Sequence, residues 1–103
     1  FDREGNLLKR RKLGGMIEEM KTVGAELAVA VGRNIRTKDA SIHGVALLST
    51  PELELVDWLP AAGPCVAVAA SPKHVVAMEA PLQLDSGEVV GSYRILVWRK
   101  IGR

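Results

Sequence analysis

Cysteine is nearly absent from this sequence, and aromatic residues are scarce. Cys65 is the single cysteine among 103 residues, so the chain can form neither an internal disulfide nor a cysteine-based zinc cluster. Aromatic residues make up 4% of the chain, which counts against a platform of stacked rings for single-stranded nucleic acid. No apolar run approaches the roughly 18 residues of a membrane-spanning helix. These absences favour a soluble protein in a reducing, intracellular and cytoplasmic setting.

The composition is that of one folded domain. Hydrophobic residues make up 48% of the chain and charged residues 25%, which excludes wholesale disorder. A chain of this length buries about two-thirds of the surface that its unfolded form exposes, so it needs no metal or disulfide to fold. We expect a basic arm or short first strand over residues 1–15 and a single globular domain over residues 16–103.

A helix is predicted to begin at Met16. Apolar side chains recur there with a spacing that fits one helical face, at Met16, Met20, Val23, Leu27 and Val31. The end of this helix stays open, because residues 26–31 alternate apolar side chains and alanines and fit a strand after a turn at Gly24 equally well.

Strand patterns fill most of the remaining sequence. Candidate strands lie near residues 27, 42, 53, 65, 75 and 89, a recurrence every 10 to 15 residues that is typical of sandwiches and barrels. We therefore predict a β-rich α+β domain: a mostly antiparallel sandwich or barrel of five or six strands with one N-terminal helix. The alternative is a mixed α/β fold, in which Thr50-Pro51 and Ser71-Pro72 each begin a short helix.

The segment Glu88–Lys100 carries the strongest strand pattern. Apolar side chains occupy both of its faces, and it follows a predicted hairpin turn over residues 85–88. A strand of this length, with Gly91 available for a bulge, is predicted to cross the middle of a sheet.

Charge is segregated along the chain. Residues 1–38 carry nine basic and five acidic side chains, residues 39–88 carry one and seven, and residues 89–103 carry four and none. If the two basic ends meet, they form one positive surface for a polyanion, either a nucleic acid or an acidic membrane. The candidate polyanion-binding residues are Lys9, Arg10, Arg11, Lys12, Arg33, Arg36, Lys38, Arg99, Lys100 and Arg103.

The same segregation also suits association between protein chains. An acidic middle on one copy complements basic ends on another, which favours a homo-oligomer, and the basic ends equally suit an acidic protein partner. Trp58 and Trp98 are the candidate interface residues, because tryptophan is enriched among residues that dominate binding energy.

The sequence offers little catalytic chemistry. A thiol site can be assembled only from Cys65, His43, His74 and Asp57, which lie on separate predicted elements without a local signature. We expect Cys65 to be a small buried hydrophobe, and both histidines to be surface or capping groups. No metal-ligand spacing, phosphate-binding loop or other cofactor motif occurs.

The predicted layout of a helix followed by antiparallel strands, ending in LDSGEVVGSYRILVWRK, resembles that of hotdog-type thioester-binding domains. This resemblance implies an alternative function as an enzyme that binds a small ligand or a thioester. It brings no active-site motif to any residue here. The function favoured by the residues is a non-enzymatic structural or interaction domain that self-associates and presents a basic surface to a polyanion.

Overall fold

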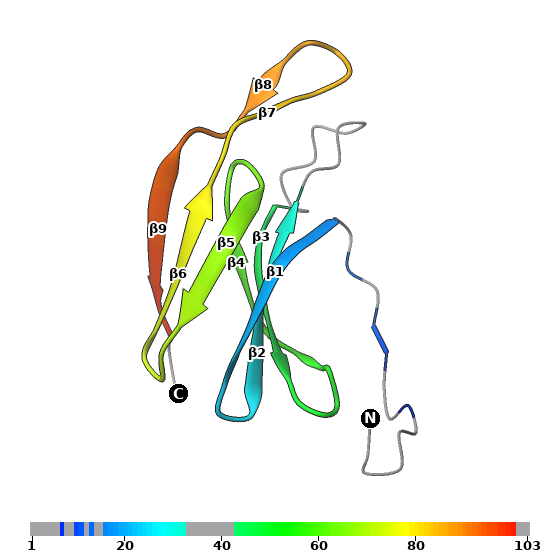
Figure 1. Ribbon diagram of the computed structural model, residues 1–103, viewed down its shortest axis with the longest axis vertical. Helices are drawn as coiled ribbons and strands as arrows, with labels where there is room; N and C mark the ends of the chain where they lie inside the picture. The colour runs from blue at the N-terminus through cyan, green and yellow to red at the C-terminus, as the bar shows by residue number, and fades with distance from the viewer. Residues whose placement is uncertain (1–6, 8–9, 12, 14–15, 33–42, 101–103) are drawn as a thin grey trace.

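The chain folds into antiparallel β-sheets. The computed structural model describes residues 7, 10–11, 13, 16–32 and 43–100. The first sheet is a meander of four strands in the order β1 (Met16–Val23), β2 (Glu26–Gly32), β3 (Gly44–Ser49) and β4 (Leu55–Pro60). The second sheet has the order β5 (Cys65–Ala70), β6 (His74–Glu79) and β9 (Arg94–Arg99). A small hairpin of β7 (Leu82–Gln83) and β8 (Val89–Val90) extends beyond it (Figure 1).

The predicted N-terminal helix is wrong. Its residues form β1, which pairs along its length with β2 across a tight turn where Gly24 adopts a φ of 59°. The strand reading of residues 26–31 is the correct one of the two that the sequence left open. Pairing with β2, and a bond from the amide of Val68 to the Glu19 carboxylate at 3.0 Å, override the helical spacing.

The predicted α+β class is therefore replaced by an all-β class in the described part of the chain, with three sheets that do not close into a barrel. The mixed α/β alternative is also wrong. Thr50 and Pro51 lie in the turn between β3 and β4, and the Ser71 hydroxyl accepts a bond from the His74 amide at 3.1 Å in the turn between β5 and β6. The described residues contain no helix that is long and apolar enough to cross a membrane.

The main core lies between the two larger sheets. Strand β5 packs against β1 and β2, and the facing sides contribute small and branched residues, including Ala28, Ala30, Val45, Leu47, Val68, Val75 and Ala77. A second buried cluster lies on the opposite face of the first sheet, where Leu13 and Trp58 pack against Val29 and Val31. The first sheet thus has buried apolar side chains on both of its faces.

The predicted long central strand is divided and placed at an edge. Gly91 adopts a φ of +77°, which separates β8 from β9. The predicted turn over residues 85–88 does join β7 and β8 as a hairpin, in which the Leu84 amide donates to the Glu88 carbonyl at 2.8 Å. Strand β9 pairs with β6 alone and forms the outermost strand of its sheet.

Candidate interaction surface

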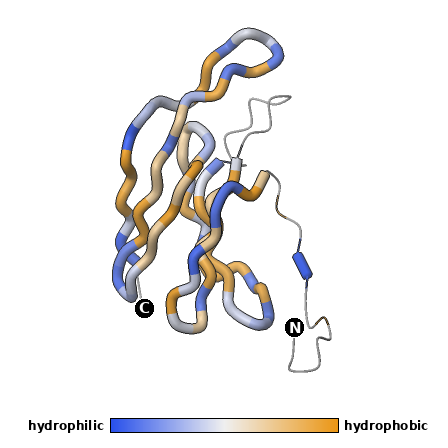
Figure 2. The backbone as a smooth tube through the Cα atoms, in the orientation of Figure 1, coloured by the Kyte–Doolittle hydropathy of each residue, from blue (hydrophilic) through white to orange (hydrophobic). Residues whose placement is uncertain are grey.

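The second sheet turns an apolar face away from the core. The register of β5, β6 and β9 aligns the side chains of this outer face in two rows, Ala67–Met78–Ile95 and Ala69–Val76–Val97. Ile95 is 69% exposed, Val97 is 62% exposed and Met78 is 47% exposed. Figure 2 shows the apolar middle of β9 between hydrophilic positions at its two ends.

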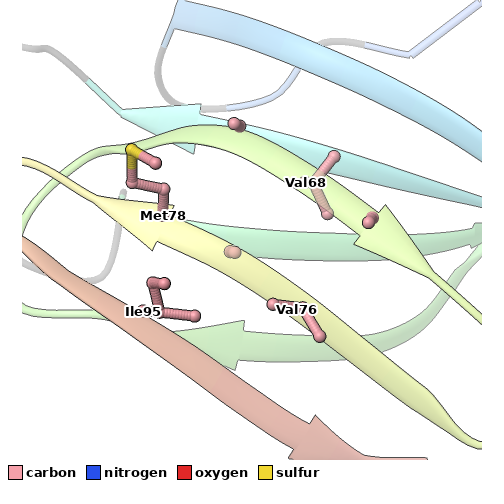
Figure 3. Close-up of a pocket in the computed structure, with 7 residues that line it drawn as sticks. Val68, Val76, Met78 and Ile95 are labelled. Atoms are coloured by element: carbon pink, nitrogen blue, oxygen red, sulfur yellow. The ribbon is translucent and has the colours of Figure 1, made fainter.

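A shallow hollow of about 210 Å³ lies on this outer face. Figure 3 shows Val76 and Met78 on β6 and Ile95 on β9 around it. The alanines of β5 leave room beside these larger side chains, because they carry only a methyl group. No acid or histidine lines the hollow, so it offers an apolar contact rather than a general acid or base.

Tyr93 extends the apolar surface at the start of β9. Its side chain is 84% exposed, the highest value among the large hydrophobic residues of the described chain. An aromatic side chain exposed to this degree, directly before a strand that presents Ile95 and Val97, adds to the apolar surface available to a partner.

The beginning of β9 is fixed by a buried carboxylate. Glu79 is fully buried, and its Oε2 accepts bonds at 2.9 Å from Arg94 Nε and from the Ser92 amide. Its Oε1 accepts bonds at 3.1 Å from Arg94 Nη2 and from the Ala62 amide. Burial alone raises the pKa of Glu79, but the bonds from Arg94, Ser92 and Gly63 and the Arg94 charge outweigh burial and lower the pKa below 4.5.

The end of β9 is fixed by a second ion pair. Lys100 Nζ lies 3.2 Å from Glu26 Oε1 on β2, and only 2% of the Lys100 side chain is exposed. Glu79 and Glu26 therefore hold the two ends of β9 to the rest of the domain. Between these ends, Ile95 and Val97 are presented on an ordered strand.

The predicted polyanion-binding residues are only partly described. Arg10, Arg11 and Arg99 are exposed, whereas Lys100 is buried against Glu26 and is not available at the surface. The remaining candidates lie outside the described residues, namely Lys9, Lys12, Arg33, Arg36, Lys38 and Arg103.

The described parts of the two basic ends both lie near the turn between β1 and β2. Arg11 Nη1 donates to the Leu53 carbonyl at 3.1 Å, which places Arg11 at the connection from β3 to β4. In that connection the Thr50 amide donates to the Ala25 carbonyl at 2.9 Å, and Lys100, directly after β9, bonds to the adjacent Glu26. The described parts of both basic ends therefore reach the same end of the first sheet.

The predicted interface tryptophans pack against the two cores. Trp98 contacts the main core from the inner side of β9, and Trp58 contacts the second cluster from β4. Both are half-buried. The exposed apolar residues of β9 are instead Ile95 and Val97, on the opposite face of the strand.

The four residues of the possible thiol site have different surroundings. Cys65 is fully buried, and burial together with the nearby Glu79 charge raises the pKa of its thiol to about 11, which disfavours the reactive thiolate. His74 is exposed, as expected. His43 is buried, against expectation; its Nδ1 lies 3.3 Å from the Ala62 carbonyl, and its Nε2 has no hydrogen-bond partner among the described residues. Within the described part of the chain, no group of His, Cys, Asp or Glu side chains is arranged to hold a metal ion.

The sequence analysis did not predict that Tyr93, Ile95 and Val97 lie at the surface, although the apolar side chains on both faces of their segment pointed to it. Apolar side chains on both faces of one strand require cover on both sides. That pattern predicts a central strand, whereas no described residue covers the outer face of β9. Comparison with protein-family models, with curated proteins and with solved structures found no match for this chain.

Proposed function

We propose that this chain is a non-enzymatic interaction domain that associates with copies of itself through β9 and the apolar outer face around it. The observation that supports the proposal most directly is the exposure of Ile95 and Val97 on a strand held at both ends by ion pairs, with the exposed Tyr93 directly before it. Ordered apolar surfaces of this kind mark sites that a partner covers. A second copy is the favoured partner because a second antiparallel β9 adds the same apolar residues, Ile95 and Val97, to those of the first copy.

Replacing Ile95 with lysine is expected to raise the dissociation constant of self-association by about tenfold or more, because a charge on an apolar edge strand opposes both pairing and burial. Sedimentation equilibrium over a range of protein concentrations measures this constant. Met20→Lys is the matched control, since Met20 is 53% exposed on β1 in the other sheet. A wild-type chain that stays monomeric at high concentration contradicts the proposal, as does an Ile95→Lys variant that associates like the wild type.

The proposal includes a basic surface for a polyanion at the N-terminal run. Arg10 and Arg11 are exposed there, and the bond from Arg11 to Leu53 holds this run beside the folded domain. Arg99 is also exposed, but its neighbour Lys100 is engaged with Glu26. The N-terminal run is thus the better supported of the two basic ends.

The variant Arg10→Glu is expected to weaken binding to heparin. It is also expected to reduce the slope of the logarithm of the binding constant against the logarithm of the salt concentration by about one or more, because each contact with an anionic group releases a counterion. Binding measured at low and moderate salt gives both quantities. Arg99→Glu is the matched comparison, because it makes the same charge change at the other basic end, and it is expected to weaken binding less. Equal losses in the two variants would contradict the assignment to the N-terminal run alone, and binding without salt sensitivity would contradict a polyanion surface altogether.

The enzyme alternative receives less support from the fold. The hotdog-like layout required a helix against the sheet, and the described residues at that position form β1 instead. The hollow on the second sheet is shallow and lined by apolar residues only. This hollow therefore holds no group that could act in catalysis.

A further inference from the structure

The open edge of β9 presents backbone groups as well as apolar side chains. The Lys100 amide donates to the Lys73 carbonyl at 2.8 Å, and the antiparallel register continues from His74 opposite Arg99 without a shift. In an antiparallel ladder, alternate residues direct both backbone groups to the same neighbour. Even-numbered residues of β9 therefore bond to β6. The odd-numbered ones direct their N–H and C=O groups to the open edge: Ile95, Val97 and Arg99.

The two edges of the second sheet differ in their protection. On β5, the outward-facing amide of Val68 donates to the Glu19 carboxylate of β1 at 3.0 Å, and β1 packs alongside. On β9, no strand of the described chain pairs with the open edge. The middle of β9, Ile95 to Val97, contains no proline, no charge and no bulge, which are the usual devices against edge pairing.

We propose that two copies of this chain pair through antiparallel β9 strands around a two-fold axis at Leu96, which joins their second sheets into one continuous sheet. This inference rests on the proposed self-association and specifies its geometry. A pairing centred on Leu96 lets Ile95 and Val97 of each copy exchange backbone bonds with Val97 and Ile95 of the other. A shift by one residue would place the outward N–H and C=O groups of one copy opposite even-numbered residues of the other copy, whose backbone groups already bond to β6. Only registers shifted by two residues therefore compete.

Side-chain chemistry favours the Leu96-centred register over those shifted by two. It places Ile95 opposite Val97 of the second copy, both on the outer face, and Arg99 opposite Tyr93, the residue before β9 in the second copy. The first pair is apolar, and the second combines a cation with an aromatic ring. No two arginines face each other, because Arg94 lies opposite Trp98 of the second copy. A shift by two places Arg99 opposite either Ile95 or Gly91 and removes both Ile95–Val97 pairs.

Disulfide cross-linking tests this register. Directly opposite residues that exchange backbone bonds lie about 5.5 Å apart at Cα, within the range that a disulfide spans. An equal mixture of Ile95→Cys and Val97→Cys proteins is expected to give several-fold more cross-linked dimer under mild oxidation than either protein alone. The wild type is the control, because its Cys65 is fully buried. If either single variant, Ile95→Cys or Val97→Cys, cross-links with itself as well as the mixture does, the Leu96-centred register is overturned.

The variant Val97→Pro tests edge pairing separately from register. Proline removes the outward N–H of residue 97 and leaves the bonds from β9 to β6 in place, so sedimentation is expected to show a monomer with an unchanged β-sheet circular dichroism spectrum. If Val97→Pro still forms a dimer and the mixture of Ile95→Cys and Val97→Cys does not cross-link, edge pairing is overturned, whereas self-association itself stands. A wild-type monomer removes the proposed self-association and this inference together.

Discussion

Replacing Glu79 with alanine is expected to lower the free energy of unfolding by about 3 kcal/mol at neutral pH, because it removes one partner of a buried ion pair. The Glu79 carboxylate accepts bonds from Arg94 and from the amides of Ser92 and Ala62. These donors lose their acceptor in the variant. Because the Arg94 side chain is 48% exposed and water can solvate it, we expect the low end of the range for broken buried pairs.

Chemical denaturation measures this loss. Glu52→Ala is the matched control, since Glu52 is exposed in the turn after β3, and its effect is expected to stay within about 0.5 kcal/mol. A Glu79→Ala variant as stable as Glu52→Ala would contradict the role of Glu79 in holding β9. Glu79→Gln keeps the shape of the side chain and removes its charge, so it separates the charge from the packing.

The pH dependence of stability gives an independent readout of the same carboxylate. The pKa of Glu79 is lowered in the folded state below the ordinary 4.5, so the folded state favours the ionised form. Its contribution is present above the unfolded-state pKa and is lost as the pH falls through the folded-state pKa. The stability advantage of the wild type over Glu79→Gln is therefore expected to shrink below about pH 4.5; a constant advantage at all pH values would contradict this assignment.

The elements predicted correctly from the sequence are those with strong local signals. Cys65–Ala70 is a short apolar run between a proline-rich turn and Ser71-Pro72, and residues 85–88 supply the residue types of a hairpin turn. In both segments the local chemistry and the final structure agree.

The incorrect predictions depend on contacts between residues far apart in the sequence. The spacing from Met16 to Val31 satisfies a helix, and the strand is selected by pairing with β2 and by the bond between Glu19 and Val68, which are 49 residues apart. His43 is buried against Ala62, 19 residues away. Such partners cannot be identified by periodicity, because periodicity describes one element at a time.

The candidate interaction surface on β9 could be predicted only in part, for the same reason. Apolar residues on both faces of Glu88–Lys100 correctly indicate that both faces require cover. Strand order determines whether that cover comes from the same chain, and strand order is a property of the whole fold. With β9 at an edge, the outer face bearing Ile95 and Val97 is left for a partner.

Replacing Gly91 with alanine is expected to destabilise the fold by about 3 kcal/mol, because steric overlap adds to an unfavourable backbone conformation. Gly91 has a φ of +77°, and a Cβ atom there would lie 2.6 Å from the Cα atom of Gly63. The atoms it would meet belong to the backbone, which cannot move aside as a flexible side chain does. This contact joins the connection before β5 to the connection before β9, so it sets where β9 begins.

Gly87→Ala separates the two contributions. Gly87 has a φ of +89°, and nothing lies within 4 Å of a Cβ atom built there, so its replacement is expected to cost only about 1 kcal/mol from backbone conformation. Thermal and chemical denaturation of the two variants measure the difference. Equal losses would show that Gly91 is needed for its φ alone. A larger loss for Gly91→Ala, accompanied by weaker self-association, is the result expected if the close approach to Gly63 positions the edge strand for its partner.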